Sequence, residues 1–329
     1  MRLGLFPTFT LFEIPFRGSF KNITKFSISL TRPKVLFLKF AIMTRNKDSW
    51  SSTQLRQSLV RHHVSYACLR FSRLAGRIGY GPSAGVGRID LLKDANALIV
   101  RPIGKGSLEE LVFRMDLLHR LERSGLYILN PPKAIEHCVD KYSVLAVLEE
   151  NGVPVPRTAT TESVSQALKA FDELGKDVVV KPIFGSRGEG TTRLVDREIA
   201  STAFRAIAFN HGVIYVQEFV DHGFSDIRAF VLGDNVIAAM RRTASSWKTN
   251  YSQGARPESI SLEKSVDDLV IKSAKAVSCK LAGVDILESK TGPLVVEINS
   301  QPGWKGLQSV TKFNIADSVV EFVLSELKK

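Results

Sequence analysis

The sequence predicts an α+β protein with mixed sheets, divided into two or three sub-domains, of which the first is an α/β unit. Two observations lead to this prediction. From Leu38 onward, short apolar runs typical of buried strands alternate with amphipathic stretches that carry helix caps. In the last third of the chain, pairs of strand-like runs joined by short turns predict β-hairpins.

The α/β unit begins with an apolar run that predicts a buried strand. Ser107 and Glu110 have the spacing of a capping box, and Gly125 stands where a helix commonly ends. The predicted elements are a strand at 35–43, a helix at 49–63, a strand at 97–103, a helix at 107–125 and a strand at 126–130. We interpret 81–88 as an ordinary loop and Pro131–Pro132 as a turn that closes the unit.

Beyond this turn, capped helices and strands continue to alternate. Asp140 and Ser163 are good N-cap residues, and a strand, a glycine loop and a returning strand are predicted over 177–195. The further helices are predicted at 140–152, 163–175, 198–209, about 264–282 and about 314–327. The further strands are predicted at 213–220, in a hairpin over 226–242, and in a second hairpin that ends near 299.

Composition indicates which partners are plausible. Lys and Arg outnumber Asp and Glu by 45 to 33, which gives a net charge of +12. This excess suits nucleic acid, an anionic membrane or a polyanionic small substrate, although a basic surface can also serve solubility alone. Cys68, Cys138 and Cys279 lie far apart among apolar neighbours, which predicts isolated, reduced thiols in a cytoplasmic protein. No apolar stretch is long enough to span a bilayer.

The first 37 residues differ from the rest of the chain. They contain one acidic residue, Glu13, several basic residues, many Ser and Thr, and no steady helical or strand period. A transit peptide has this composition, and a start site placed too early explains it equally well. We expect residues 1–37 to be an extension outside the domains, and we expect a chain that begins at Leu38 to fold.

A glycine loop follows the strand that ends in Lys181. Glycines let backbone N–H groups approach a phosphate chain, and a lysine beside them supplies a point charge. Gly185, Ser186, Gly188 and Gly190 are therefore candidate phosphate-binding residues. No Gly-Lys-Ser/Thr follows, so this is not a Walker A loop. A tight hairpin with a solvated turn is the alternative.

Acidic and amide side chains interrupt the apolar strands of the last hairpin. The strand period of two puts Glu297 and Asn299 on one face, and Asp285 on the partner strand can point into the same space. This all-oxygen set suits Mg²⁺, whereas a solvated edge strand is the alternative. Arg228 and Arg241, on the two strands of the preceding hairpin, are candidate clamps for a phosphoryl group, although surface arginines on strands are common.

With these residues placed, the chain resembles the ATP-grasp superfamily and, within it, the RimK-like glutamate ligases. The resemblance rests on seven motifs in order: DKYSVLAVL, VVVKPIFGSRGEG, VQEFV, DIRAFVLGDNVIAA, WKTNYSQGA, AGVDIL and VVEINSQPGWKGLQ. It implies an ATP-grasp fold with a pre-ATP-grasp domain at 38–133 and an ATP-grasp domain at 134–329, whose lobes are about 134–216 and 217–329. The tryptophan in the last motif is most similar to that of archaeal-type members.

The resemblance also implies roles for individual residues. Lys141 and Lys181 correspond to the lysines that hold the ATP phosphates, and Gln217, Glu218 and Phe219 to the strand that meets adenine. Asp226, Lys248 and Asn250 correspond to further nucleotide contacts, and lysine in place of arginine at 248 loses the bidentate fork. Asp285, Glu297 and Asn299 correspond to the ligands of two Mg²⁺ or Mn²⁺ ions, bridged by Glu297, and Arg228 and Arg241 to catalytic cations that steady an acyl phosphate.

The family chemistry is the ATP-dependent ligation of an amine to a carboxylate through an acyl phosphate. The resemblance implies L-glutamate as the amine donor and an acidic acceptor, either a coenzyme such as tetrahydromethanopterin or a deazaflavin, or the C-terminus of a ribosomal protein. We expect neither direct nucleic-acid binding nor membrane binding, and a homo-oligomer is possible. One alternative is a ligase acting on the amino-acid carrier protein of lysine or arginine biosynthesis, and another is an ATP-binding regulatory module that ligates nothing.

Overall fold

The computed structural model describes residues 40–185 and 188–329, all within one compact unit, Phe37–Lys329. The predicted extension at 1–37 and the predicted phosphate contact Ser186 lie outside the described residues. In the part of the chain that is described, no helix is both long and apolar enough to cross a membrane.

The first sheet has four parallel strands in the order β2-β1-β6-β7. Their bounds are β1 Phe40–Met43, β2 Tyr66–Leu69, β6 Ala97–Val100 and β7 Tyr127–Leu129. Alternate residues of β1 enter different cores: Phe40 and Ile42 pack with α1 (Trp50–Arg61), and Ala41 and Met43 pack with α3 (Leu108–Arg123). Helices therefore cover both faces, which explains why these strands are continuous apolar runs.

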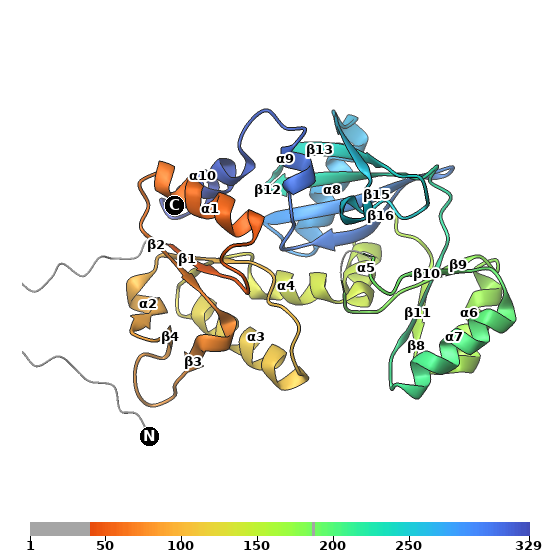
Figure 1. Cartoon of the computed structure of the whole chain (residues 1–329), viewed down its shortest axis with the longest axis horizontal. Coiled ribbons are helices and arrows are strands. Elements are labelled where there is room, and N and C mark those ends of the chain that lie inside the picture. The colour runs from red at the N-terminus through yellow and green to blue at the C-terminus, as the bar shows by residue number, and fades with distance from the viewer. Residues whose placement is uncertain (1–39, 186–187) are drawn as a thin grey trace, which may run out of the picture. The chain divides into compact units, whose positions relative to one another are not determined.

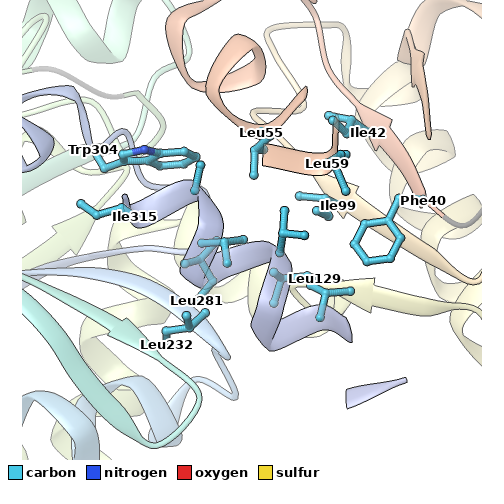
Figure 2. Packing of buried hydrophobic residues seen from close by; sticks show 14 of the residues in the cluster. Phe40, Ile42, Leu55, Leu59, Ile99, Leu129, Leu232, Leu281, Trp304 and Ile315 are labelled. Carbon is cyan, nitrogen blue, oxygen red and sulfur yellow. The ribbon is translucent and has the colours of Figure 1, made fainter. Parts of the chain in front are cut away.

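The C-terminal helix belongs to this first core. Helix α10 (Ile315–Glu326) lies beside α1 in Figure 1, and the Ser58 hydroxyl donates a hydrogen bond of 3.1 Å to the Ala316 carbonyl. Figure 2 shows Trp304 and Ile315 near Leu55 and Leu59 of α1. Helix α10 therefore packs in the same core as the first sheet and α1.

Capping residues delimit several helices as predicted. The Ser107 and Glu110 capping box is present at α3. Asp140 caps α5 (Lys141–Glu150) and Ser163 caps α6 (Val164–Glu173). These local predictions are confirmed.

Other predictions for the N-terminal half are wrong. Residues 81–88 are not an ordinary loop, because they contain β4 (Ala84–Val86) of a small antiparallel sheet with β3 (Leu74–Gly76) and β5 (Ile89–Asp90). Pro132 does not close a turn but begins helix α4 (Pro132–Val139), since proline is well suited to the first helical position. The prediction also missed β2 and the short helix α2 (Leu91–Asp94).

The cysteines are not all isolated, contrary to the prediction. The Cys138 and Cys279 Sγ atoms lie 3.5 Å apart, although 141 residues separate them in the sequence. Cys138 lies on α4, and Cys279 follows helix α8 (Lys264–Ala276). Because the two segments are far apart in the sequence, the spacing of the cysteines alone could not predict that these thiols meet.

The second sheet is antiparallel, in the order β10-β9-β11-β8. Its bounds are β8 Thr158–Thr161, β9 Val178–Val180, β10 Thr192–Leu194 and β11 Ile214–Glu218. Helices α6 and α7 (Arg197–Phe209) cover one face, where Phe171 and Phe204 pack against Val178 and Val216. The opposite face carries Val179 and Gln217.

The third sheet has five antiparallel strands in the order β14-β13-β12-β15-β16. Their bounds are β12 Ser225–Leu232, β13 Asn235–Thr243, β14 Arg256–Ile260, β15 Leu281–Ser289 and β16 Gly292–Asn299. Helices α5 and α8 cover its apolar face through Leu148 and Val270. Helix α8 ends at Ala276, short of the predicted Ala282, because Ser278 adopts a left-handed φ of 58° and β15 follows.

A short connection links this sheet to α10. It contains helix α9 (Lys305–Gln308) and the buried Trp304, whose ring lies 6.1 Å from those of both Trp50 and Phe230. Single-turn 3₁₀ helices at Phe71–Arg73 and Tyr251–Gln253 complete the described elements.

Candidate active site

A cleft that is open to solvent lies between the second and third sheets, and residues of both sheets line it. Most of the predicted site residues line it. These are Lys141, Lys181, Gly185, Gly188, Gln217, Glu218, Phe219, Asp226, Lys248, Asn250, Asp285 and Glu297. Gly190, Arg228, Arg241 and Asn299 are not among the lining residues.

Two lysines supply positive charge on the side of the second sheet. Lys141 begins α5, and its Nζ donates a hydrogen bond of 2.8 Å to the Gly185 carbonyl. Lys181 follows β9, and its Nζ donates to Gln217 Oε1 at 2.8 Å. Burial lowers the pKa of Lys141, and it lowers the pKa of Lys181 to about 8. Two partly desolvated ammonium groups that line the same cleft create a site for an anion.

The glycine loop reaches the cleft with backbone conformations that favour glycine. Gly185, Gly188 and Gly190 have φ values of 139°, 70° and 72°. A Cβ on Gly188 would lie 2.6 Å from the Asn250 Oδ1 atom. A side chain at position 188 would therefore displace the Asn250 side chain, in addition to the strain of the positive φ.

The end of β11 forms another wall of the cleft. The Gln217 amide group donates to the Thr158 hydroxyl at 2.9 Å and to the Tyr215 hydroxyl at 3.0 Å. The backbone N–H groups of Glu218 and Phe219 are already used, because they donate to the Arg157 and Asp177 carbonyls. The predicted adenine contacts at these two residues are thus limited to carbonyls.

Carboxylates and arginines alternate across the face of the third sheet. Arg242 donates to both Asp226 oxygens, with Nε–Oδ1 at 2.7 Å, and its Nη2 lies 3.0 Å from Asp285 Oδ1. Arg228 also donates to both oxygens of Asp285. Although burial acts to lower the pKa of Arg242, the carboxylates of Asp285 and Asp226 raise it above its ordinary value.

Glu297 faces Asp285 across the last hairpin, where the two residues are direct partners in the strand register. Burial and the Asp285 charge raise the pKa of Glu297, although Arg228 and the two lysines oppose this shift. The two carboxylates repel each other, and a divalent cation between them removes that repulsion. Burial also raises the pKa of Asp226, although the Arg242 guanidinium acts to lower it.

Asn299 completes the predicted ligand set on the same strand. Its Nδ2 atom is buried without a hydrogen-bond partner among the described residues. Within 40–185 and 188–329, no group of three or more His, Cys, Asp or Glu side chains is arranged to hold a metal ion, so the candidate metal site depends on two carboxylates and one amide. All three side chains offer oxygen, the donor that Mg²⁺ prefers, and the set therefore fits this ion.

The predicted pair of arginines is only partly brought to the site. Arg228 contacts Asp285, but Arg241 points to Glu288 and to the Ser225 hydroxyl. Arg242, its neighbour on β13, lines the cleft instead. Arg242 was not among the predicted site residues. The strand period contained a signal for it, since the hairpin register places Arg242 opposite Asp226. The prediction also missed His222, Trp247 and Thr249, which line the cleft from loops.

The comparison with protein families agrees with this geometry. Residues 138–323 match the model of the RimK-like ATP-grasp domain, and this range includes the cleft residues. The chain belongs to the RimK-like ATP-grasp family. It is therefore an ATP-dependent ligase that forms carbon–nitrogen bonds.

Similar proteins cover nearly all of this RimK-like ligase. The tetrahydromethanopterin:alpha-L-glutamate ligase of Methanococcus maripaludis is 33% identical over 89% of this chain and 100% of its own length. That of Methanocaldococcus jannaschii is 32% identical over 88% of this chain and 100% of its own. A probable alpha-L-glutamate ligase of Legionella pneumophila is 32% identical over 64% and 72%.

Solved structures support the fold. The ATP-grasp ligase PsnB, complexed with its minimal precursor, matches with a TM-score of 0.71 at 21% identity, over 88% of this chain and 100% of PsnB. A RimK domain protein from Sphaerobacter thermophilus matches with a TM-score of 0.68 at 18% identity, over 86% and 98%. The predicted α+β, ATP-grasp architecture is confirmed.

Proposed function

We propose that this ligase attaches L-glutamate to a carboxylate of an acidic acceptor, with ATP as the energy source and an acyl phosphate as the intermediate. The observation that carries the proposal is the cleft itself. It brings two partly buried lysines, a glycine loop and a pair of mutually repelling carboxylates together in a protein whose relatives are named alpha-L-glutamate ligases.

ATP would lie along the second sheet. Lys141 and Lys181 neutralise its phosphates, and the N–H groups of the glycine loop add hydrogen bonds. The base meets the end of β11, where the Val220 N–H has no backbone partner among the described residues. Since Glu218 and Phe219 already donate their N–H groups, Val220 is the donor that we assign to adenine. Lys248 and Asn250 close the opposite wall.

Asp285, Glu297 and Asn299 would hold two Mg²⁺ ions, with Glu297 as the bridging ligand. The ions would supply charge neutralisation for the phosphate oxygens. Asp285 also accepts hydrogen bonds from Arg228 and Arg242, which fix the direction of its carboxylate.

The reaction needs two steps because a carboxylate is a poor electrophile. An acceptor carboxylate oxygen attacks the γ-phosphorus, the bond to the β,γ-bridging oxygen breaks, and ADP leaves. The α-amine nitrogen of glutamate then attacks the acyl carbon, the bond from that carbon to the phosphate oxygen breaks, and the nitrogen loses a proton. Positioning and charge carry most of this catalysis. We assign the steadying of the acyl phosphate to Arg228 and Arg242, because both contact Asp285, whereas Arg241 is paired with Glu288.

For the acceptor, we propose a polyanionic coenzyme of the tetrahydromethanopterin type. Three relatives that carry this acceptor in their names support the choice, and a net charge of +12 suits any acidic acceptor. A ribosomal protein C-terminus is the second candidate. The relatives favour neither a carrier-protein ligase nor a regulatory module.

The test uses Mg-ATP, glutamate and a panel of acceptors, with ADP release and glutamyl mass additions as readouts. We expect Glu297→Gln to abolish turnover and to leave the thermal unfolding cooperative. Glu288→Gln is the matched control, since Glu288 lies on the partner strand of the same hairpin and pairs with Arg241 outside the cleft. Near-normal ADP release by Glu297→Gln in the presence of all substrates would refute the assignment.

A further inference from the structure

Arg101 is a buried cation outside the cleft. It directly follows β6, and only 2% of its surface is exposed. Its Nη2 donates to the Pro302 carbonyl at 2.9 Å and to the Ser51 hydroxyl at 3.2 Å, and its guanidinium lies 4.9 Å from the centre of the Trp304 ring. Its Nε and Nη1 atoms are buried and have no hydrogen-bond partner among the described residues.

Other buried arginines in the described part of the chain have counter-charges. Arg242 contacts two aspartates, and Arg114 pairs with Glu110 and donates to two backbone carbonyls. For Arg101, burial lowers the pKa to about 10, and no carboxylate offsets that shift. A desolvated guanidinium with two unused N–H groups is unfavourable unless an anion joins it.

The segment that Arg101 contacts contains further unpaired donors. Asn299 Nδ2, Gln301 Nε2 and Trp304 Nε1 are likewise buried without a hydrogen-bond partner among the described residues. These residues belong to the short segment that leads from the metal hairpin to α9, and Arg101 holds that segment through the Pro302 carbonyl. A surplus of N–H donors with a positive charge matches an oxygen anion.

The segment also connects Arg101 with the proposed reaction centre. A Cβ built on Gly283 would lie 2.9 Å from Pro302 Cβ and 2.6 Å from Arg228 Nη1, so Pro302 and Arg228 are neighbours. Arg228 in turn holds Asp285. Arg101 therefore stands behind the last loop of the site, on the side formed by the first sheet.

We propose that Arg101 binds a carboxylate of the incoming glutamate, an inference that rests on the proposed function. As the amine donor, glutamate enters with two carboxylates, and neither of them reacts. Both keep their charge throughout the reaction and need donors. Arg228 and Arg242 are paired with Asp285 and Asp226 and are already assigned to the acyl phosphate, whereas Arg101 has unused N–H groups. The first sheet thereby contributes to substrate specificity, although the lining of the nucleotide cleft contains none of its residues.

Steady-state kinetics of Arg101→Met and Arg101→Lys test the proposal. We expect Arg101→Met to raise the KM for glutamate about tenfold or more, the loss expected when a charged hydrogen bond is removed, with the KM for ATP unchanged. Arg101→Lys, which keeps the charge and loses the planar fork, should lie between Met and wild type. Arg61→Met is the control, because Arg61 forms an exposed ion pair with Asp317.

Substrate analogues separate recognition from a structural role. Glutamine and the α-amide of glutamate each lack one carboxylate. In the wild type, the analogue that lacks the carboxylate bound by Arg101 should lose about tenfold in kcat/KM, and in Arg101→Met that additional loss should disappear. Thermal shifts on titration with glutamate give a second readout that needs no turnover.

Three results would overturn the proposal. They are an unchanged KM for glutamate in both folded variants, a raised KM for the acceptor alone, and equal losses for the amide analogues in wild type and variant. If Arg101→Met does not fold, Arg101→Lys and the glutamate titration decide. A wild type that ligates no glutamate contradicts the proposed function, whereas normal ligation with unaltered variants contradicts the role of Arg101 alone.

Discussion

The charge of Lys181 makes nucleotide binding depend on pH in a way that can be calculated. Burial lowers the pKa of Lys181 to about 8, and its Nζ stays 2.8 Å from Gln217 Oε1. Only the ammonium form attracts phosphate. Below pH 8 the affinity for Mg-ATP should be constant, and above it the affinity should fall about tenfold per pH unit, or about 1.4 kcal/mol. The fall ends where the complex itself loses the proton.

Protein stability should change in the opposite direction. The pKa of Lys181 in the folded state lies below the ordinary value of 10.5, so the unfolded chain binds more protons between pH 8 and 10.5. Stability therefore rises with pH over this window as far as Lys181 contributes. A loss of affinity together with unchanged or increased stability separates deprotonation of Lys181 from general unfolding.

Isothermal titration calorimetry with a non-hydrolysable ATP analogue, from pH 7 to 9.5 at constant ionic strength, measures this effect. Thermal unfolding is recorded in the same buffers. Lys181→Arg is the control, because a guanidinium keeps its charge throughout this range. An affinity that stays constant up to pH 9.5 in the wild type, or that falls equally in Lys181→Arg, refutes the reasoning.

Three further predictions concern other parts of the molecule. Asn130→Ala removes the hydrogen-bond partner of buried backbone groups at 280, 281 and 300. At about 1–3 kcal/mol for each group, the free energy of unfolding in a urea titration should fall by about 4 kcal/mol or more, and a loss below about 1 kcal/mol would contradict this. Gly188→Ala introduces strain at a φ of 70° and a contact of 2.6 Å with Asn250. Nucleotide affinity should therefore fall about tenfold while the melting temperature changes little. Adding Asn250→Ala to this variant should restore part of the lost affinity. The buried thiol of Cys279, whose pKa is raised by the hydrogen bond with Cys138 and by burial, should not react with a thiol reagent at pH 8 until the chain is unfolded, and fast labelling of the native protein would show that this contact is open.

The success of the sequence predictions depended on how local their physical causes are. Caps at Ser107 and Ser163 act within one helical turn, so the residues alone determine where α3 and α6 begin. The end of α8 is a different case. Its apolar period continues to Ala282, but β15 needs Leu281 and Ala282 for pairing with β12, and this long-range pairing overrides the helical pattern. Short strands such as β4 lack any periodic signal.

Within the candidate site, strand alternation explains both the success and the error. Asp285 and Glu297 could be placed together because a hairpin makes them direct partners. The same alternation separates Arg241 from Arg242, and only the register of β12 with β13 shows that Arg242 is the partner of Asp226. Arg101 could not be found in this way. Its guanidinium, which has no carboxylate partner among the described residues, is recognised only once a contact across 201 residues places it beside Pro302.

The arrangement of charges follows from which part of the third sheet is left uncovered. Helices α5 and α8 bury the apolar residues of one face, and the first core covers Phe230 and Leu232 on the other face. The polar residues on the rest of that face must be satisfied by one another or by a ligand. Asp226, Asp285 and Glu297 meet two arginines there, which leaves one carboxylate unmatched and facing Lys141 and Lys181. A cation held by Asp285 and Glu297 would free these lysines for phosphate. Metal and nucleotide binding should therefore be coupled. The metal would replace the lysines as partner of the carboxylates, and the phosphates would replace the carboxylates as partners of the lysines.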